Sequence, residues 1–145
     1  MSSIAETLMQ AVLARLQGSP PVIANANIRR QHRTVVTRAE APAVHLIDGT
    51  DTPTPAKNDC RTDRSKAFTV SIFVRDDAGY EAADPIMVEI NARLDPGAAD
   101  YTAYGAGIAL RQGRITVEQE IADGDALRVD MEFTFEYRTA GWTLA

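Results

Sequence analysis

The feature that most constrains the fold is an uninterrupted alternation of apolar and polar residues from Ala126 to Arg138. The apolar set is Leu127, Val129, Met131, Phe133, Phe135 and Tyr137, and the polar set is Arg128, Asp130, Glu132, Thr134, Glu136 and Arg138. Strict period-two alternation predicts a β-strand with one buried side and one solvent-facing side. Such a strand needs sheet neighbours and a layer packed on its apolar face, so we expect it to anchor the core.

The bulk properties indicate one soluble domain spanning residues 1–145. The length of 145 residues suits a single core. The net charge of −5 gives no overall attraction to nucleic acid. No apolar run is long enough to span a bilayer, and the start at Met1 lacks the basic region of a signal peptide. Cys60 is the only cysteine, so an internal disulfide is excluded and a reducing compartment is expected.

The N-terminal residues predict an amphipathic helix. Ser3 and Glu6 have the spacing of a capping box, in which each side chain satisfies a backbone N–H of the other residue. Apolar residues recur every four positions, at Ile4, Leu8, Val12 and Leu16, with Met9 and Leu13 beside them. Gly18 and the pair Pro20-Pro21 then end the helix.

A second helix is predicted before Pro96-Gly97. Its apolar stripe consists of Ala83, Met87, Ile90 and Leu94. Asp84-Pro85 suits an N-cap followed by the first helical position, but a start near Tyr80 is equally open.

Short strands and turns account for much of the remaining chain. The strands are predicted at 43–47, 68–74, 107–110 and 115–121, with a further candidate at 34–37. Turns are predicted at Gln112-Gly113 and at Asp123-Gly124. The order predicts an α+β fold, a mostly antiparallel twisted sheet with two helices packed on one face.

The segment from Thr50 to Lys66 is the one shift in composition. It holds two prolines, many polar residues and no large apolar side chain. We therefore predict a long loop, of a length that is usually functional or disordered. Since the core would not need such a loop, removing residues 61–64 is expected to leave the fold intact but to weaken assembly.

Several groups of residues have types that can bind metals. Asp48, Asp51, Asp59 and Asp63 offer the oxygen ligands that hard cations prefer, but they lack EF-hand spacing. His32, His45 and Cys60 have no metal-ligand spacing. The glycines Gly97, Gly105 and Gly107 form no dinucleotide-binding or P-loop pattern. We predict no metal and no cofactor, with the aspartates in a solvated loop.

Two charged groups are open to more than one interpretation. The basic group is Arg29, Arg30, His32, Arg33 and Arg38, which suits phosphate, an acidic surface of a neighbouring subunit, or solvent. The acidic group is Glu118, Glu120, Asp130, Glu132 and Glu136, predicted on the polar face of two adjacent strands. Paired carboxylates can perform acid–base catalysis, but a solvated strand face carries the same residues. In a ring, that face would line a lumen whose negative charge repels DNA phosphates.

The closing run RVDMEFTFEYRT, residues 128–139, resembles the final strand of the tail terminator family of tailed bacteriophages, the minor tail protein U-like group. Other pieces agree in order along the chain. They are the N-terminal helix, the segment EAPAVHLIDG at 40–49, the polar loop, the strand FTVSIFVR at 68–75 and a helix from Ala83-Asp84-Pro85 to Leu94.

The resemblance implies a structural virion protein without catalysis. Members form a ring, usually hexameric, at the head-proximal end of the tail tube, where they stop tube polymerisation and dock the head-completion protein. DNA passes through the lumen without specific binding. Assembly would take place in the host cytoplasm, and no membrane is involved.

The family has no short motif to transfer, so site residues are chosen on physical grounds. Contact elements are expected in the loop at 50–66, the turn at 76–81 and the basic group. The interface candidates are Asp51, Lys57, Arg61, Asp63, Arg64, Arg29, Arg30, Arg33, Asp76 and Asp77. The lumen candidates are Glu118, Glu120, Asp130, Glu132 and Glu136.

Three other functions are compatible with the same residues. One is a different neck protein, such as an adaptor or stopper of the phage connector. Another is a small enzyme that uses the carboxylates of the last two strands, which a deep pocket holding Glu118, Glu132 and a histidine would favour and an open solvated sheet would count against. The last is a monomeric α+β binding module, which the oligomeric state distinguishes from a ring.

Overall fold

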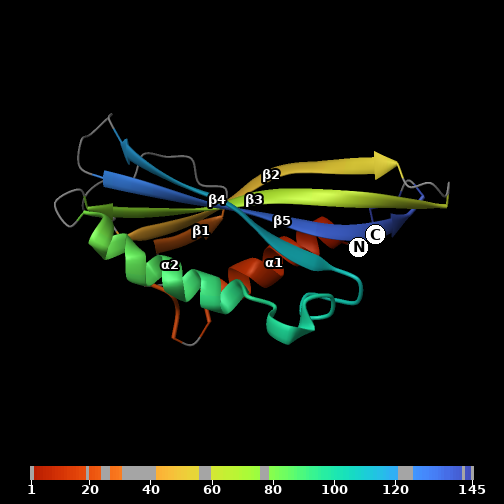
Figure 1. Cartoon of the computed structure of the whole chain (residues 1–145), viewed down its shortest axis with the longest axis horizontal. Coiled ribbons are helices and arrows are strands. Elements are labelled where there is room, and N and C mark those ends of the chain that lie inside the picture. The colour runs from red at the N-terminus through yellow and green to blue at the C-terminus, as the bar shows by residue number, and fades with distance from the viewer. Residues whose placement is uncertain are drawn as a thin grey trace.

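The computed structural model describes residues 2–18, 20–23, 27–30, 42–55, 60–75, 79–120, 126–141 and 143–144. A long twisted sheet carries two helices on one of its faces (Figure 1). This arrangement confirms the predicted α+β class with a mostly antiparallel sheet.

Within the described residues the sheet has five strands. They are β1 (Ile28–Arg30), β2 (Ala43–Pro55), β3 (Arg61–Arg75), β4 (Ala109–Glu120) and β5 (Ala126–Ala140), in the spatial order β1-β2-β3-β5-β4. The β1–β2 pair is parallel and the other pairs are antiparallel. The alternating strand β5 therefore lies between two neighbours, as its pattern requires.

The predicted faces of β5 are confirmed. Val129, Met131, Phe133, Phe135 and Tyr137 are each at most 4% exposed, and Leu127 is partly buried. The ring of Phe68 on β3 stacks against both Phe133 and Phe135, with centroids 5.3 Å apart in each pair. Aromatic stacking of this kind contributes beyond the area that it buries.

Helix α1 (Ile4–Leu16) begins as predicted, since the Ser3 hydroxyl oxygen accepts the Glu6 N–H at 3.1 Å. Its apolar stripe is buried through Leu8, Met9, Val12 and Leu16. The Glu6 carboxylate, in contrast, turns away from the cap and accepts hydrogen bonds from Gln10 and Arg30. One half of the capping box is therefore confirmed.

Helix α2 (Tyr80–Leu94) begins at the earlier of the two predicted positions. Gly79 precedes it with a φ of 67°, and the predicted stripe Ala83, Met87, Ile90 and Leu94 is buried. Pro85 consequently lies inside the helix rather than at its first position. A short 3₁₀ helix, η3 (Gly97–Ala99), follows, and the Asp95 carboxylate accepts the Gly97 N–H at 2.8 Å.

The prediction of a long loop at 50–66 is wrong, because most of it extends β2 and β3. Their pairing continues from Asp51 opposite Lys66 to Pro55 opposite Thr62, while residues 56–59 lie outside the described part. On its other side, this part of β3 pairs with β5, as in Arg61 opposite Ala140. Backbone ladder bonds do not require apolar side chains, and threonine favours strands.

The same pairing overturns the expectation that residues 61–64 are dispensable for the fold, since residues 62–64 pair with a strand on each side and Arg61 pairs with β5. The prolines Pro53 and Pro55 remain compatible with a strand because this part of β2 has no neighbour beyond it in the described sheet. Proline in sheets is confined to such edges.

The predicted turn at Gln112-Gly113 is also wrong. Strand β4 runs through it, and the register against β5 shifts between Gln112 and Ile115. A β-bulge therefore replaces the turn, and one strand replaces the predicted pair at 107–110 and 115–121. A Cβ on Gly113 would lie 3.1 Å from both the Cβ and the backbone oxygen of Glu132, which explains the glycine. The turn at Asp123-Gly124 lies outside the described residues, although β4 and β5 pair directly on either side.

Strand β1 was not predicted, because Ile28 is its only apolar residue. Ile28 is buried and lies opposite Val44. The strand candidate at 34–37 lies outside the described residues.

Part of the sheet projects past the helices in Figure 1, where β2, β3 and β5 continue together. We call this three-stranded part the distal arm and define it as residues 50–55, 61–66 and 135–140. The two chain ends lie side by side, with the Ile4 N–H donating to the Leu144 carbonyl at 2.9 Å.

Candidate functional site

The polar residues of β5 form one continuous sheet face with their partners on β3 and β4. Arg128 lies opposite Glu118, Asp130 opposite Thr116, and Asp63 opposite Arg138. The described side chains along β4 and β5 on this face are half-buried to exposed, apart from Ala109, which is buried opposite Glu136. The predicted acidic group is therefore brought together, because the antiparallel register repeats the alternation of β5 on its neighbours.

The carboxylates on this face are neutralised by arginines. Four arginines pair with five carboxylates: Arg128 with Glu118 and with Asp130 at 3.3 Å, Arg114 with Glu132 at 3.3 Å, Arg111 with Glu136 at 3.6 Å, and Arg138 with Asp63 at 2.5 Å. The Arg138 guanidinium lowers the pKa of Asp63 below its usual value by hydrogen bonding. The face thus presents alternating charges with a small net charge rather than a bare negative surface.

For one of the five acidic lumen candidates, the structure describes only the backbone position. Glu120 lies on β4 opposite Ala126, but its side chain is outside the described set. The other four side chains lie on this face, and each pairs with an arginine. They are Glu118, Asp130, Glu132 and Glu136. The sequence pattern located this group correctly but did not reveal the arginines as its partners.

The enzyme interpretation gains no support from the arrangement of His45. Across the strands, the register places His45 opposite Ser71 and Ser71 opposite Asp130. The Ser71 hydroxyl donates to the Asp130 carboxylate at 2.6 Å. In a serine-nucleophile triad the histidine lies between the hydroxyl and the carboxylate, whereas here the serine occupies the middle. His45 is buried, with its ring centroid 4.9 Å from that of Phe73.

The hollows formed by the described residues do not bring a histidine together with the carboxylates of β4 and β5. One hollow, of about 390 Å³, is lined by residues that include Asp63, Glu136 and Tyr137. A hollow of about 450 Å³ lies between the end of α2, η3 and β4, lined by residues that include Asn91, Asp95 and Phe133. It contains neither a histidine nor Glu118 or Glu132. The pocket that would favour the enzyme interpretation is therefore not seen among the described residues.

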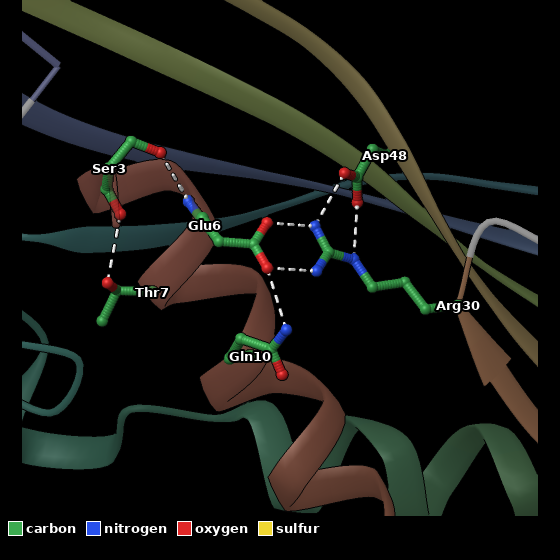
Figure 2. Close-up of polar contacts among 6 residues, drawn as sticks. All are labelled: Ser3, Glu6, Thr7, Gln10, Arg30 and Asp48. Atoms are coloured by element: carbon green, nitrogen blue, oxygen red, sulfur yellow. Dashed lines mark hydrogen bonds and ion pairs between the residues drawn. The ribbon is translucent and has the colours of Figure 1, made fainter. Parts of the chain in front are cut away.

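Arg30, predicted as an interface residue, is engaged within the chain. Its guanidinium forms two hydrogen bonds with Glu6 of α1, at 2.7 and 2.8 Å, and two with Asp48 of β2, at 2.8 and 3.3 Å (Figure 2). The Arg30 side chain is 17% exposed. The bond from Arg30 lowers the pKa of Glu6 from 4.5 to about 2. This triad fastens α1 to the sheet, and paired bidentate contacts of this type are strong.

The distal arm holds most of the other described interface candidates. Asp51 accepts the Tyr137 hydroxyl at 2.6 Å and lies 3.8 Å from the Arg64 guanidinium. Arg64 also donates to the Thr139 hydroxyl at 3.2 Å. Burial raises the pKa of Tyr137 above its ordinary value, and the bond to Asp51 adds to the shift. Asp51 and Arg64 therefore stabilise the helix-side face of the arm, whereas Arg61 is exposed on β3.

The structure describes only some of the remaining interface candidates. Arg29 is exposed on β1. Lys57, Arg33, Asp76 and Asp77 lie outside the described residues, as do His32, Arg38 and Asp59. The turn candidate at 76–81 is described from Gly79 onward, where α2 begins.

Metal and membrane interpretations were tested on the described ranges alone. Over those residues, no group of three or more His, Cys, Asp or Glu side chains is close enough to hold a metal ion. Cys60 is exposed next to the start of β3. The helices that the structure describes include none with the length and apolarity to cross a membrane.

Sequence reasoning missed two features of the site, the distal arm and the Arg30 triad. A signal for the arm exists in the alternation of threonines in TDTPTP at 50–55, which fits a strand whose side chains are polar on both faces. The triad left no local signal, because Glu6, Arg30 and Asp48 are far apart in the sequence.

Comparison with known proteins adds one finding on the fold. A scan against models of protein families finds no match, and no curated protein matches in sequence. Among solved structures, 33 chains match. One belongs to the virion of a native gene transfer agent particle, with 15% sequence identity and a TM-score of 0.67 over 96% of this chain and 100% of that chain. The two chains therefore share a fold over almost their whole length.

Proposed function

We propose that this protein is a structural component of a phage-like virion that forms a ring at the head-proximal end of the tail tube. The ring ends tube polymerisation and joins the tail to the head-completion protein. The observation that carries the proposal is the shared fold with a chain of the gene transfer agent virion, which extends over 100% of that chain. The order of helices and strands that resembles the tail terminator family supports it.

The polar sheet face is proposed to line the lumen of the ring. A passage for DNA must neither bind phosphates nor repel them strongly. Because Arg111, Arg114 and Arg128 alternate with carboxylates on this face, its field falls off within a short distance. This modifies the expectation from sequence: the face suits DNA passage through charge balance rather than through net negative charge.

The distal arm is the proposed contact with the tail tube or the head-completion protein. It projects beyond the helices in Figure 1. Arg61 and Arg138 are exposed on it, and Asp63 is half-buried. Its three strands are paired with one another through β3, and such a preorganised surface loses less entropy on docking. Exposed positions 52–54 of β2 lie along its outer edge.

The test is a tube-elongation assay with purified tube protein from the same particle. Added wild-type protein is expected to halt elongation, seen by electron microscopy as tubes of fixed length. Thr54→Arg, at an exposed position of the arm, is expected to lose most of this effect. Thr102→Arg, at an exposed position after η3, is the matched control and should act like wild type. Tubes that elongate equally with and without wild-type protein would refute the proposal.

A further inference from the structure

Strand β4 is the last strand of the described sheet on its side and leaves one row of backbone groups without a strand partner. The distal part of β2 also lies at an edge, but Pro53 and Pro55 remove N–H donors there. Strand β4 contains no proline, and residues 111–118 are all exposed. Of these two edges, β4 is the one suited to accept another strand.

The helix-side face of β4 carries exposed apolar residues next to this edge. Ile115 lies opposite Met131 and Val117 opposite Val129, so both point to the side where the core lies. They are nevertheless 50% and 48% exposed. Val88 is 62% exposed on α2, one turn before Asn91, whose side chain accepts a hydrogen bond from Gln112 of β4 at 3.3 Å. A patch of this kind at a strand edge indicates an interaction site.

We propose that β4 pairs with β4 of a second copy of this chain, antiparallel and centred on Thr116, to give a twofold dimer with one continuous sheet. In this register Ile115 lies opposite the partner copy's Val117, and Arg114 opposite its Glu118. A one-residue shift would place apolar residues opposite polar ones, which the pleat disfavours. A two-residue shift would separate the Ile115 and Val117 pair.

Charge complementarity identifies the second copy as the occupant. Within one chain, Arg114 pairs with Glu132, and Arg128 pairs with Glu118. Across the proposed contact, Arg114 of one copy meets Glu118 of the other. The row that results runs Glu132, Arg114, then Glu118 and Arg128 of the second copy, with the sign of the charge alternating at each step. The twofold axis generates the same row a second time, and opposite charges on facing strands stabilise the pairing.

The pairing covers the exposed edge of the free protein, where an unprotected strand would promote aggregation. It closes after two copies, because the twofold contact uses the same strand on both. It does not rest on the ring proposal, since a ring needs a head-to-tail contact between different surfaces. Helix α2 packs mainly against β3, two strands inward from this edge, and also reaches β4 through the hydrogen bond between Asn91 and Gln112.

Disulfide trapping tests the register. In a Cys60→Ser background, Thr116→Cys places one thiol on the proposed axis, opposite the same thiol of the other copy. Gln112→Cys is the matched control on the same strand. Its two thiols would be offset by eight residues, or about 27 Å at the rise of an antiparallel strand. Both variants are oxidised at high protein concentration and resolved on a non-reducing gel.

The expected result is a covalent dimer from Thr116→Cys and almost none from Gln112→Cys. Adding Val117→Asp to the Thr116→Cys chain should abolish the dimer, because Val117 is half exposed and its charge would enter the apolar contact. Equal or absent dimer from the two cysteine variants would overturn the proposal. Failure here with normal capping of tubes would leave the proposed function intact, which separates the two claims.

Discussion

Replacing Phe135 with alanine is the strongest test of the core assignment. The side chain is fully buried on β5, with its ring centroid 5.3 Å from that of Phe68 and 5.1 Å from that of Tyr104. Truncating a buried phenylalanine costs about 3–5 kcal/mol, and each lost aromatic pair adds about 0.5–1.5 kcal/mol within that range. We therefore expect Phe135→Ala to lower the free energy of unfolding by about 4–5 kcal/mol.

Two neighbours on the same strand provide the comparison. Phe133 is also buried, but it borders the hollow of about 450 Å³ beside α2, so water can enter the space that truncation leaves. Phe133→Ala is therefore expected to cost about 3 kcal/mol, at the lower end of the range. Thr134 lies between them on the polar face, and Thr134→Ala should change stability by less than about 0.5 kcal/mol.

Urea unfolding followed by far-ultraviolet circular dichroism measures all three variants. Equal slopes of the unfolding free energy against urea would show that only stability has changed. The reasoning is refuted if Thr134→Ala destabilises the protein as much as Phe135→Ala. It is also refuted if Phe135→Ala unfolds within about 1 kcal/mol of wild type, since such a residue could not be in the core.

Three further predictions concern individual contacts. Because Arg30 lowers the pKa of Glu6 to about 2, the stabilisation from this pair is present above pH 4.5 and is lost as the pH falls toward 2. Glu6→Gln should therefore reduce the pH dependence of the urea unfolding midpoint between pH 4.5 and 2. An unchanged pH dependence in this variant would contradict the triad. Gly113→Val should destabilise the fold by about 1–3 kcal/mol because its side chain would crowd Glu132. Thermal unfolding measures this cost, and a midpoint equal to that of the wild type would contradict the close approach of Glu132 to Gly113. Tyr137→Phe removes the hydrogen bond to Asp51 and should lower the free energy of unfolding in urea by about 1–2 kcal/mol. In a chain that also carries Asp51→Asn, the same tyrosine change should cost less.

The sequence predicted those parts of the fold in which side-chain pattern and structure coincide. The alternation of β5 and the stripes of α1 and α2 bury large apolar residues at a regular period, and the strand at 68–74 buries a run of β-branched and aromatic residues. Periodicity detects burial, so these elements could be assigned without knowledge of their neighbours. The polar residues on the opposite face of β5 followed from the same alternation.

The errors occur where backbone pairing rather than burial determines the structure. In the distal arm, Thr62, Asp63 and Ser65 are held by ladder bonds to strands on both sides, which leave no apolar signal. At Gly113 a turn and a bulge call for the same residue, and only the register against β5 distinguishes them. The Arg30 triad joins residues from α1, β1 and β2, so it depends on tertiary contacts that a local pattern does not encode.

Electron microscopy of tail tubes incubated with the purified protein tests the central claim most directly. The account predicts a ring of density at one end of each tube, with the polar face of β4 and β5 lining its opening. It also predicts that tubes bearing the ring no longer grow when more tube protein is added. Tubes whose ends carry no added density, and which continue to grow in the presence of the protein, would contradict the account.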